Sequence, residues 1–219
     1  MAQDPKAPSQ PEKDVAMTSS RRLGPIGAAT RTLMLEGAEF ILREEGYALL
    51  TSRRVANHIG VKQQLVFYYF RTMDELIVEA FRRLARRELE RLENALRSDS
   101  PLREIWDVCI NPSDARLIAE FMALAHRNEH LRKEVIAHIE RMRCIHVEAL
   151  ARASDSKDGG LAALPPVAIS FLATSAALAL TRESALGVSM GHAEVLALIR
   201  QSITALEPQG ADTNRARQV

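Results

Sequence analysis

Apolar residues recur every three or four positions along most of the chain, which is the spacing of one face of an α-helix. The pattern predicts a first helix over residues 26–45, followed by two short helices that meet at Gly60. A long helix should then cover residues 72–97, with Thr72 as its cap and Glu75 completing a capping box. No stretch of any length alternates apolar and polar residues as a strand does. The sequence therefore predicts an all-α fold.

Five more helices are predicted in the second half, separated by loops rich in Asp, Ser, Gly and Pro. The helix after Pro165 is apolar nearly all round between Val167 and Leu180, which is more than one face of a small domain needs. Such a helix is either central to its own domain or part of a dimer interface. The predicted helices cover residues 101–109, about 129–153, 166 to about 186 and 193–206, and one more begins at Pro112 with Leu117, Ile118, Phe121, Met122 and Ala125 facing inward.

Residues 51–70 contain two short amphipathic stretches joined by a glycine. Thr51 can cap the first stretch, because its hydroxyl can accept a backbone N–H of the first turn. Gly60 stands where a chain leaving a helix often needs a positive φ. This arrangement is typical of a helix-turn-helix that binds DNA.

The second stretch begins with polar, long side chains and ends with four aromatic residues. Gln63 and Gln64 can pair bidentately with adenine, and Lys62 can reach guanine or phosphate. The aromatic residues 67–70 are expected to pack in the core and, through the tyrosine hydroxyls, to contact phosphates. This composition predicts a recognition helix.

Residues 28–80 resemble the DNA-binding domain of the TetR family of transcriptional regulators. The family pattern runs roughly T-x-R-D-I-A-x-x-A-G-V-S-x-G-T-L-Y-H-Y-F, followed by x-S-K-E-x-L. The residues that carry the resemblance are Arg53, Val55, Ala56, Gly60, Val61, Phe67, Tyr69 and Phe70, with Ala38, Leu42, Gly46 and Tyr47 upstream and Thr72, Asp74 and Leu76 downstream.

Some positions depart from the family pattern. Arg54 stands where the family usually has an acid, and Gln64 with Leu65 replaces a Gly-Thr pair. We expect Leu65 to face a thymine methyl group instead of donating a hydrogen bond. Met73 replaces a lysine that commonly meets phosphate in the family, and Arg71 is expected to compensate. These differences leave the predicted fold intact but change the expected operator sequence.

The resemblance implies a three-helix DNA-binding domain followed by a helical ligand-binding and dimerisation domain. We expect a disordered N-terminal arm over residues 1–24, the helix-turn-helix domain over 25–71, the effector and dimerisation domain over 72–207, and a disordered tail over 208–219. Arg21 and Arg22 end the arm, which either reaches a minor groove or is inert.

The resemblance also implies a function. The expected protein is a homodimeric repressor that binds a palindromic operator in double-stranded DNA and is released by a small effector. Base-reading residues are expected to be Lys62, Gln63, Gln64 and Leu65. Phosphate contacts are expected from Thr51, Arg53, Arg54, Tyr68, Tyr69 and Arg71.

No motif in the second domain fixes a ligand site. Few of the residues that are expected to face inward are polar. This favours a hydrophobic or amphipathic effector such as a fatty acyl or aromatic compound. Each candidate is equally compatible with plain core. The candidate pocket residues are Trp106, Cys109, Phe121, Met122, His126, Met142, His146, Phe171 and Thr174. The candidate dimer-interface residues are Leu172, Leu180, Leu196, Ile199 and Ile203.

The charge distribution agrees with DNA binding by the N-terminal part. The chain has a net charge of only +1, yet the stretch from Arg21 to Arg71 holds eight basic and four acidic residues. A locally basic domain on a near-neutral protein suits phosphate binding at that domain. A solvated basic face would also explain the charge, but it would not explain the motif.

Other chemistries find little support in the sequence. Cys109 and Cys144 form no disulfide framework or metal-binding spacing, and His126 and His130 lack a third ligand. No nucleophile motif, phosphate loop or carboxylate pair indicates an enzyme, so no cofactor or metal is expected. Residues 1–24 lack the apolar segment of a signal peptide.

The uncharged stretch from Gly159 to Thr181 raises the alternative of a membrane span, but Pro165 and Pro166 interrupt it. We expect a buried helix there and a cytoplasmic protein without a membrane partner. Two other functions stay open. One is a TetR-like protein that acts mainly through a protein partner, with DNA as scaffold. The other is a helical ligand-binding or catalytic protein without specific DNA readout.

Overall fold

The computed structural model describes residues 25–110, 112–154 and 164–207, and all regular structure in these ranges is helical. The predicted all-α fold is therefore confirmed. The predicted arm and tail, and most of the loop that precedes Pro165, lie outside the described residues. The elements are α1 (Pro25–Glu44), the 3-10 turn η1 (Tyr47–Leu49), α2 (Ser52–His58), α3 (Gln63–Tyr69), α4 (Met73–Leu96), α5 (Pro101–Cys109), α6 (Pro112–Ala125), α7 (Glu129–Ser154), α8 (Pro166–Ala185) and α9 (His192–Leu206).

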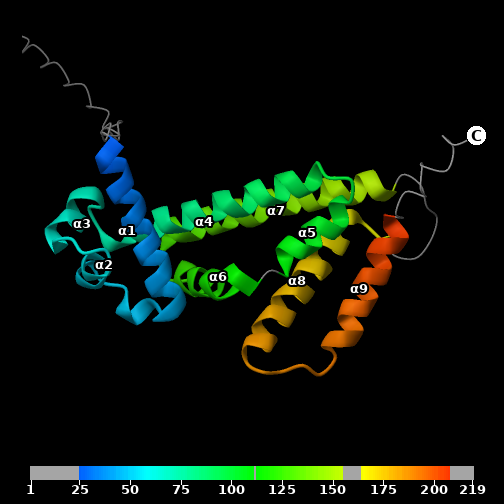
Figure 1. Ribbon diagram of the computed structural model, residues 1–219. Helices are drawn as coiled ribbons and strands as arrows, with labels where there is room; N and C mark the ends of the chain where they lie inside the picture. The colour runs from blue at the N-terminus through cyan, green and yellow to red at the C-terminus, as the bar shows by residue number, and fades with distance from the viewer. Residues whose placement is uncertain (1–24, 111, 155–163, 208–219) are drawn as a thin grey trace, which may run out of the picture.

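Two long helices, α4 and α7, run side by side along the middle of the molecule (Figure 1). Helices α1, α2 and α3 lie at one end, and α5, α8 and α9 lie at the other. Helix α6 contacts α1, α7 and α8, so it bridges the two ends. A movement of α4 or α6 would therefore displace residues at both ends of the molecule.

The hydrophobic core of the N-terminal end continues into the second half of the chain. Buried residues of α1, α2, α3, α4, α6 and α7 form one cluster, which includes Phe70, Phe81 and Phe121. The rings of Phe81 on α4 and Phe121 on α6 meet edge to face at 5.3 Å. The predicted boundary between residues 71 and 72 thus falls inside a continuous core, and the helix-turn-helix rests directly on α4.

Local interactions set the limits of the short helices as the sequence predicts. The Thr51 hydroxyl accepts a hydrogen bond from the backbone N–H of Arg54 at 3.1 Å and so caps α2. Gly60 has a φ of 73°, the left-handed conformation expected after α2. These two residues fix the start of α2 and the turn that leads into α3.

The capping box predicted at the start of α4 is only half formed. The Thr72 hydroxyl accepts from the backbone N–H of Glu75 at 3.1 Å, as expected. The Glu75 carboxylate, however, accepts from the N–H of Arg71 at 2.8 Å and not from that of Thr72. The chain enters α4 with the Arg71 amide directed at the carboxylate. This bond holds the end of α3 against the first turn of α4.

A close approach joins α1 to the helix-turn-helix. A Cβ atom placed on Gly37 would lie 3.1 Å from Ile59 and 3.2 Å from the ring of His58. One turn further along α1, the ring of Phe40 stacks on His58 with centroids 4.6 Å apart. Because no side chain separates α1 from the end of α2, the two elements pack as one body.

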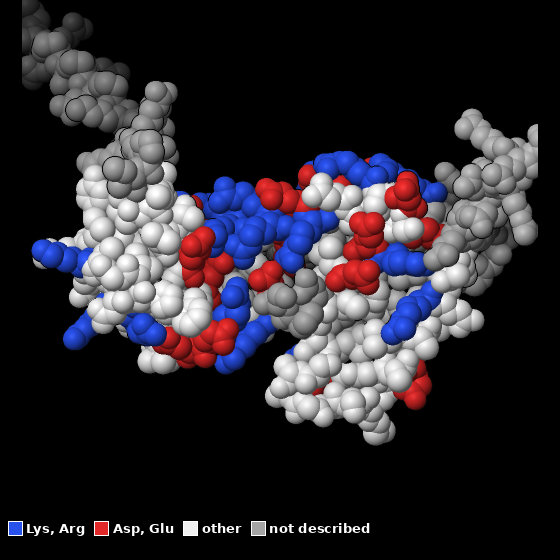
Figure 2. All heavy atoms as spheres, viewed as in Figure 1, with Lys and Arg blue, Asp and Glu red and all other residues white. Residues whose placement is uncertain are grey.

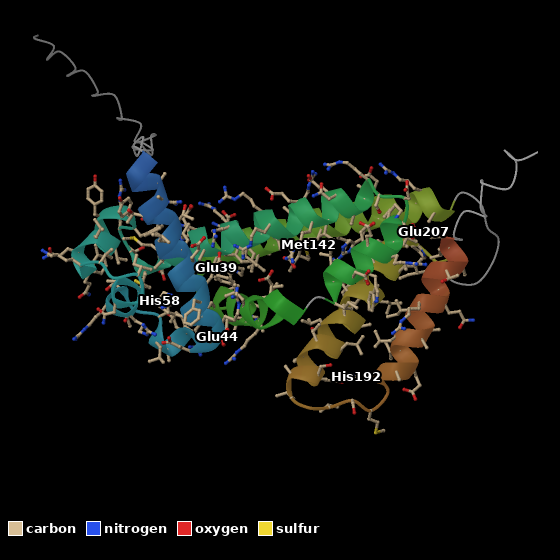
Figure 3. All side chains as sticks on the ribbon, viewed as in Figure 1. Glu39, Glu44, His58, Met142, His192 and Glu207 are labelled. Atoms are coloured by element: carbon tan, nitrogen blue, oxygen red, sulfur yellow. The ribbon has the colours of Figure 1, made fainter. Side chains whose placement is uncertain are left out.

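Helices α8 and α9 form a hairpin that projects from the far end of the molecule (Figure 1). Near its turn, His192 Nε2 lies 3.0 Å from the carboxylate of Glu183. At the other end, the Glu207 carboxylate accepts from the backbone N–H groups of Leu102 and Arg103 at 3.0 and 3.3 Å, which fixes the start of α5 (Figure 3). No helix of the described ranges is long and apolar enough to cross a membrane.

Candidate functional site

One face of the helix-turn-helix is polar and points to solvent. Helix α3 exposes residues at helical spacing along this face, and the side chain of Lys62 is exposed directly before it. The rings of Phe67 and Tyr68 are 47% and 60% exposed, respectively. The exposed residues of this face are Lys62, Gln63, Gln64, Phe67, Tyr68 and Arg71. Five of the six are among the predicted DNA contacts.

The opposite face of α3 is the one that holds it to the core. Val66 and Phe70 are buried, and Leu65 and Tyr69 are half-buried against the same cluster. The expectation that all four aromatic residues 67–70 pack in the core is thus wrong for Phe67 and Tyr68. Helical geometry turns Tyr68 about 160° away from both Val66 and Phe70, and it turns Phe67 about 100° away from Val66. Leu65, predicted to face a thymine methyl, contacts the core with part of its surface.

Gln63 is held in place from within the helix-turn-helix. Its side-chain Nε2 donates a hydrogen bond to the hydroxyl of Ser52, 2.8 Å away. Ser52 is the first residue of α2 and is itself buried. The bond therefore ties the first turn of α3 to the first turn of α2, and it leaves the amide oxygen of Gln63 and one N–H free for another partner.

The basic residues at the start of α2 lie in different settings. Arg53 is exposed, and so is Thr51 beside it. The Arg54 guanidinium instead forms a bidentate ion pair with the carboxylate of Glu45, with Nε 2.9 Å from Oε2. The hydrogen bond from Arg54 lowers the pKa of Glu45. A DNA phosphate would have to compete with this carboxylate for Arg54.

Basic side chains project from the end of the molecule that contains α2 and α3 (Figure 2). Two of the acidic residues of the neighbouring α1 are paired with arginines of α4 on its inner side. Glu39 is buried and accepts both hydrogen bonds of a bidentate pair with Arg87, at 3.1 and 3.0 Å. Glu36 pairs with Arg83 at 2.6 Å. Arginines of α4 thus neutralise α1 on its inner side, and the outer face of the helix-turn-helix stays basic.

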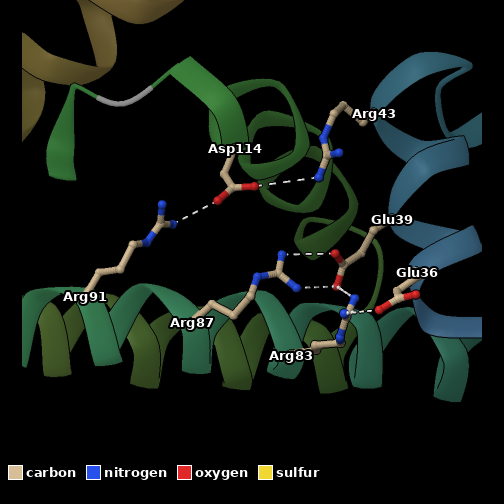
Figure 4. A network of polar contacts seen from close by, with 7 residues as sticks. All are labelled: Glu36, Glu39, Arg43, Arg83, Arg87, Arg91 and Asp114. Atoms are coloured by element: carbon tan, nitrogen blue, oxygen red, sulfur yellow. Dashed lines mark hydrogen bonds and ion pairs between the residues drawn. The ribbon is translucent and has the colours of Figure 1, made fainter. Parts of the chain in front are cut away.

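Asp114 joins three helices at the centre of this ion-pair network (Figure 4). One of its carboxylate oxygens lies 3.6 Å from Arg43 of α1, and the other lies 2.8 Å from Arg91 of α4. Asp114 itself belongs to the first turn of α6. Arg91 and Asp114 also line an internal cavity, so the network connects that cavity to the end of α1.

A cavity of about 270 Å³ lies between α4, α5, α6, α7 and α8. We call it the polar chamber, because Glu88, Arg91, Asp114, His138 and Arg143 are among its lining residues. Figure 3 labels one further wall residue, Met142, where α7 runs beside α4. Six of the nine residues predicted for a pocket line it: Cys109, Met122, Met142, His146, Phe171 and Thr174.

The other three predicted pocket residues lie elsewhere. Phe121 is fully buried against Phe81 and is plain core. His126 is exposed just past the end of α6. Trp106 lines a second cavity instead. His126 and Phe121 are on α6 or next to it, and the sequence alone does not tell which side of that helix faces the space between α4 and α7.

A second cavity of about 280 Å³ lies between α5, α7, α8 and α9. We call it the apolar chamber, since none of the described residues that line it is Asp, Glu, Lys or Arg. Ile105, Trp106, Ile169 and Ile199 are typical of its walls. The two chambers share Cys109, His146, Ser170 and Thr174.

The shared residues are polar but uncharged at neutral pH. Burial, together with the nearby positive charge of Arg143, lowers the pKa of His146 to about 4. Burial, with a contribution from Glu88, raises the pKa of the Cys109 thiol to about 12. The Cys109 sulfur lies 3.8 Å from His146 Nε2, and the Ser170 hydroxyl lies 3.3 Å from Nδ1. This chain of contacts spans α5, α7 and α8.

Sequence reasoning did not identify the buried pair of Glu88 and His138. His138 Nε2 lies 2.8 Å from the Glu88 carboxylate, and His138 is almost fully buried between α4 and α7. Its Nδ1 has no hydrogen-bond partner among the described residues. Both residues interrupt otherwise apolar helix faces, which is the signal in the sequence that points to them.

The predicted dimer residues are placed unequally. Leu180 is buried, and Leu196, Ile199 and Ile203 pack against the cluster around Trp106. Leu172 is 58% exposed and also lines the apolar chamber. Further apolar residues of the hairpin are exposed, of which Phe171 and Leu178 line the polar chamber, Leu198 lines the apolar chamber, and Val167, Leu186, Val188 and Met190 line neither. The projecting part of the hairpin carries few charges (Figure 2).

Comparison with known proteins agrees with this geometry. Residues 34–80 match the family model of bacterial regulatory proteins of the tetR family, a span that begins within α1 and ends within α4. No protein of the curated collection matches the chain.

Solved structures with the same fold are similar over nearly their whole length. A TetR transcription regulator from Haloarcula marismortui is 18% identical, with a TM-score of 0.66 over 82% of this chain and 97% of that one. A protein from Saccharomonospora viridis in complex with choline is 14% identical, with a TM-score of 0.68 over 81% and 95%. The reduced form of NemR from E. coli is 14% identical, with a TM-score of 0.63 over 81% and 96%.

The matched domain contains the helix-turn-helix with its exposed polar face, and the described chain as a whole has the fold of these structures. Residues 34–80 are therefore a DNA-binding domain of the tetR family, within a chain that has the fold of these solved structures.

Proposed function

We propose that this protein is a homodimeric, effector-controlled repressor that binds a palindromic operator. The observation that carries the proposal is the outer face of α3. It presents Lys62, Gln63 and Gln64 to solvent at the start of the helix, where a recognition helix meets base edges.

Phosphate contacts are proposed for the exposed residues on both sides of these three. Thr51 and Arg53 lie at the start of α2, and Tyr68 and Arg71 lie toward the end of α3. Phosphates contacted from both sides would fix the register of the domain on the duplex. Tyr69 and Leu65 contribute less than the sequence suggests, because each is half-buried in the core.

Dimerisation is proposed through the outer surface of α8 and α9. Apolar side chains such as Leu172 and Leu198, 58% and 62% exposed, make this surface favourable to bury. A two-fold axis at the hairpin would relate the two helix-turn-helix domains, and the operator would share that symmetry. Base reading requires both recognition helices to be spaced by about one DNA turn.

Control by an effector is proposed through the polar chamber. Asp114 and Arg91 line this chamber, and Asp114 also contacts Arg43 at the end of α1. A ligand that binds more tightly to a state with displaced α4 and α6 shifts the equilibrium toward that state. The recognition helices are then wrongly spaced for the operator. The choline complex of a protein of similar fold supports the proposal that this fold can hold a small molecule.

The test is selection of genomic DNA fragments by the purified full-length protein at moderate salt, read by sequencing. We expect recovery of a palindrome whose half-sites are centred about one helical turn apart. The matched control is a variant with Lys62, Gln63 and Gln64 changed to Ala, which should recover no motif. Equal recovery of all fragments by both proteins, with binding lost as salt rises, would leave only non-specific phosphate contacts and reject the proposal.

A further inference from the structure

The two internal chambers form a single site with opposite chemical character at its two ends. Helices α5, α7 and α8 each line both chambers. On α7 the order runs from Arg143 of the polar chamber through the shared His146 to Leu150 of the apolar chamber. Cys109 on α5 and Ser170 on α8 are shared in the same way, so the two chambers adjoin at these three residues.

The volumes also indicate one site and not two. Each chamber alone, at about 270 and about 280 Å³, falls just below the roughly 300–1,000 Å³ that ligand pockets usually have. The two together fall within that range. The path from Arg143 to Leu150 covers about two turns of α7, roughly 10 Å. A ligand that uses both chambers must be elongated.

The polar chamber contains one cation that is not neutralised. The Glu88 carboxylate lies 2.8 Å from His138 Nε2, and Arg91 is paired with Asp114. Arg143 has no carboxylate partner among the described residues, and its guanidinium carbon lies 5.5 Å from the centre of the Phe171 ring. Arg143 is only half-buried, so an anion bound there keeps part of its hydration and avoids most of the cost of burial.

We propose that the effector is an elongated amphipathic carboxylate, whose head group binds Arg143 in the polar chamber and whose hydrocarbon chain passes His146 into the apolar chamber beside Trp106. This inference rests on the proposed function, because it names the effector of that regulator. The shared residues suit the passage of a chain. Cys109, His146 and Ser170 are polar, but none carries a charge at neutral pH that would repel hydrocarbon or attract the head group.

Trp106 reports directly on the apolar chamber, since it is the only tryptophan of the chain and lines that chamber. The probes are dodecanoate and two brominated forms, because bromine quenches tryptophan fluorescence at short range. ω-Bromododecanoate carries bromine at the chain end and should quench Trp106 strongly. α-Bromododecanoate carries it next to the head group and should quench weakly at equal occupancy. Equal quenching by both, or stronger quenching by the α form, would overturn the proposed orientation.

Head-group selectivity is tested with probes of the same chain length. Dodecanoate should bind at least about tenfold more tightly than dodecanol or dodecyltrimethylammonium, because only the carboxylate forms a charge-assisted bond with Arg143. Arg143→Gln should abolish this preference. Arg141→Gln, a change at an exposed arginine of α7 that lines neither chamber, should keep it. Tighter binding of the cationic probe by the unmodified protein would overturn the carboxylate assignment.

The chain end is tested by filling the apolar chamber. Ala173→Phe should weaken dodecanoate binding about tenfold or more, and Ala176→Leu, at another point of the same wall, should act in the same direction. Thermal unfolding of each variant identifies any that does not fold, and the other variant then decides. Unchanged dodecanoate affinity in a folded variant would show that the chain lies elsewhere.

Binding and repression are measured separately. If dodecanoate binds as described but does not release operator DNA, the ligand site is supported and the proposed repressor mechanism fails. If another molecule releases the operator while no amphipathic carboxylate binds, the proposed function stands and this inference is rejected.

Discussion

Gln63 donates a hydrogen bond to the hydroxyl of Ser52 and thereby joins the start of the recognition helix to the start of the helix before it. The bond leaves the amide of Gln63 with one oriented N–H and its oxygen, which is the set that pairs with adenine. Gln63→Ala should lower operator affinity by about 1–3 kcal/mol and relax preference at one base pair.

Ser52→Ala should affect the same base pair as Gln63→Ala but by a smaller amount, because the amide stays present and loses only its orientation. Both variants are measured by competition binding against operators altered at single positions. Equal losses on every sequence would show that Gln63 does not read a base. Different base pairs for the two variants would show that Ser52 does not orient it.

Variants of Arg54 and Glu45 can distinguish two roles of Arg54, which are binding a DNA phosphate and forming the ion pair with Glu45. If Arg54 meets phosphate, Arg54→Ala should reduce the slope of log affinity against log salt by about one, equally for all DNA sequences. Glu45→Gln then should strengthen DNA binding, since it frees the guanidinium and removes a negative charge. An unchanged salt slope in Arg54→Ala, with a lower melting temperature in both variants, would assign Arg54 to holding the turn after α1 against α2.

The contacts of Asp114 with Arg43 and Arg91 predict non-additive effects on operator affinity. Asp114→Asn and Arg43→Gln should each weaken operator binding, because each removes the same tie between α6 and α1. Because Asp114→Asn also removes the pair with Arg91, the double variant should bind little worse than Asp114→Asn alone, so the cycle should give a coupling of about 0.5–1 kcal/mol. Additive losses would show that the pair does not position α1 on DNA.

Burial of His146 predicts a stability that falls as the solution becomes more acidic. The pKa of His146 is about 4 in the folded protein, below its ordinary value of 6.5. At pH values between these two pKa values, His146 is protonated in the unfolded chain but not in the folded chain, which favours unfolding. This effect is absent above about pH 7 and amounts to about 2 kcal/mol at about pH 5.

Urea unfolding of the protein and of His146→Gln measures this effect. The stability advantage of the unmodified protein over the variant should shrink by that amount between the two pH values. His130→Gln, a change at an exposed histidine of α7, should show no such pH dependence relative to the unmodified protein. A constant difference between His146→Gln and the unmodified protein would show that His146 titrates normally.

Charge on the hairpin surface should prevent dimerisation. Val167→Glu with Leu186→Glu, at two exposed hairpin residues that line neither chamber, places two carboxylates where the proposed interface buries apolar side chains. Sedimentation should show a monomer, and operator affinity should fall steeply, because one domain alone makes half of the contacts. Ile136→Glu, at a comparably exposed apolar residue of α7, is the control and should leave the dimer intact. A dimer in the double variant would place the interface elsewhere.

The features that could be predicted from the sequence depend on neighbours along the chain. Thr51, Gly60 and Thr72 act within one turn of their own position, and the structure places all three as expected. The outward residues of α3 follow from helical spacing. Phe67 differs from the expectation for an aromatic residue, because its position on the helix and not its apolar character determines its exposure.

The interior of the second domain depends on contacts between distant segments. Glu88 and His138 are separated by 50 residues, and each alone is only a polar residue on a long helix. Their pairing requires the register of α4 against α7, which no local pattern specifies. The same holds for Asp114, which meets arginines on two other helices, and for Trp106, which faces the apolar chamber instead of the polar one.

Gly37 determines which parts of the molecule move together. Because Gly37 has no side chain, α1 packs directly on His58 and Ile59. The three helices of the N-terminal end should therefore move as one rigid body. Glu36 and Glu39, which form ion pairs with arginines of α4, belong to the same rigid body. A small rotation of α1 near these ion pairs would therefore displace α3 by a larger distance. Gly37→Ala would add one methyl group at this contact and loosen the packing of α1 on α2. It would weaken the response to the effector, although it changes neither the DNA-binding face nor the ligand site.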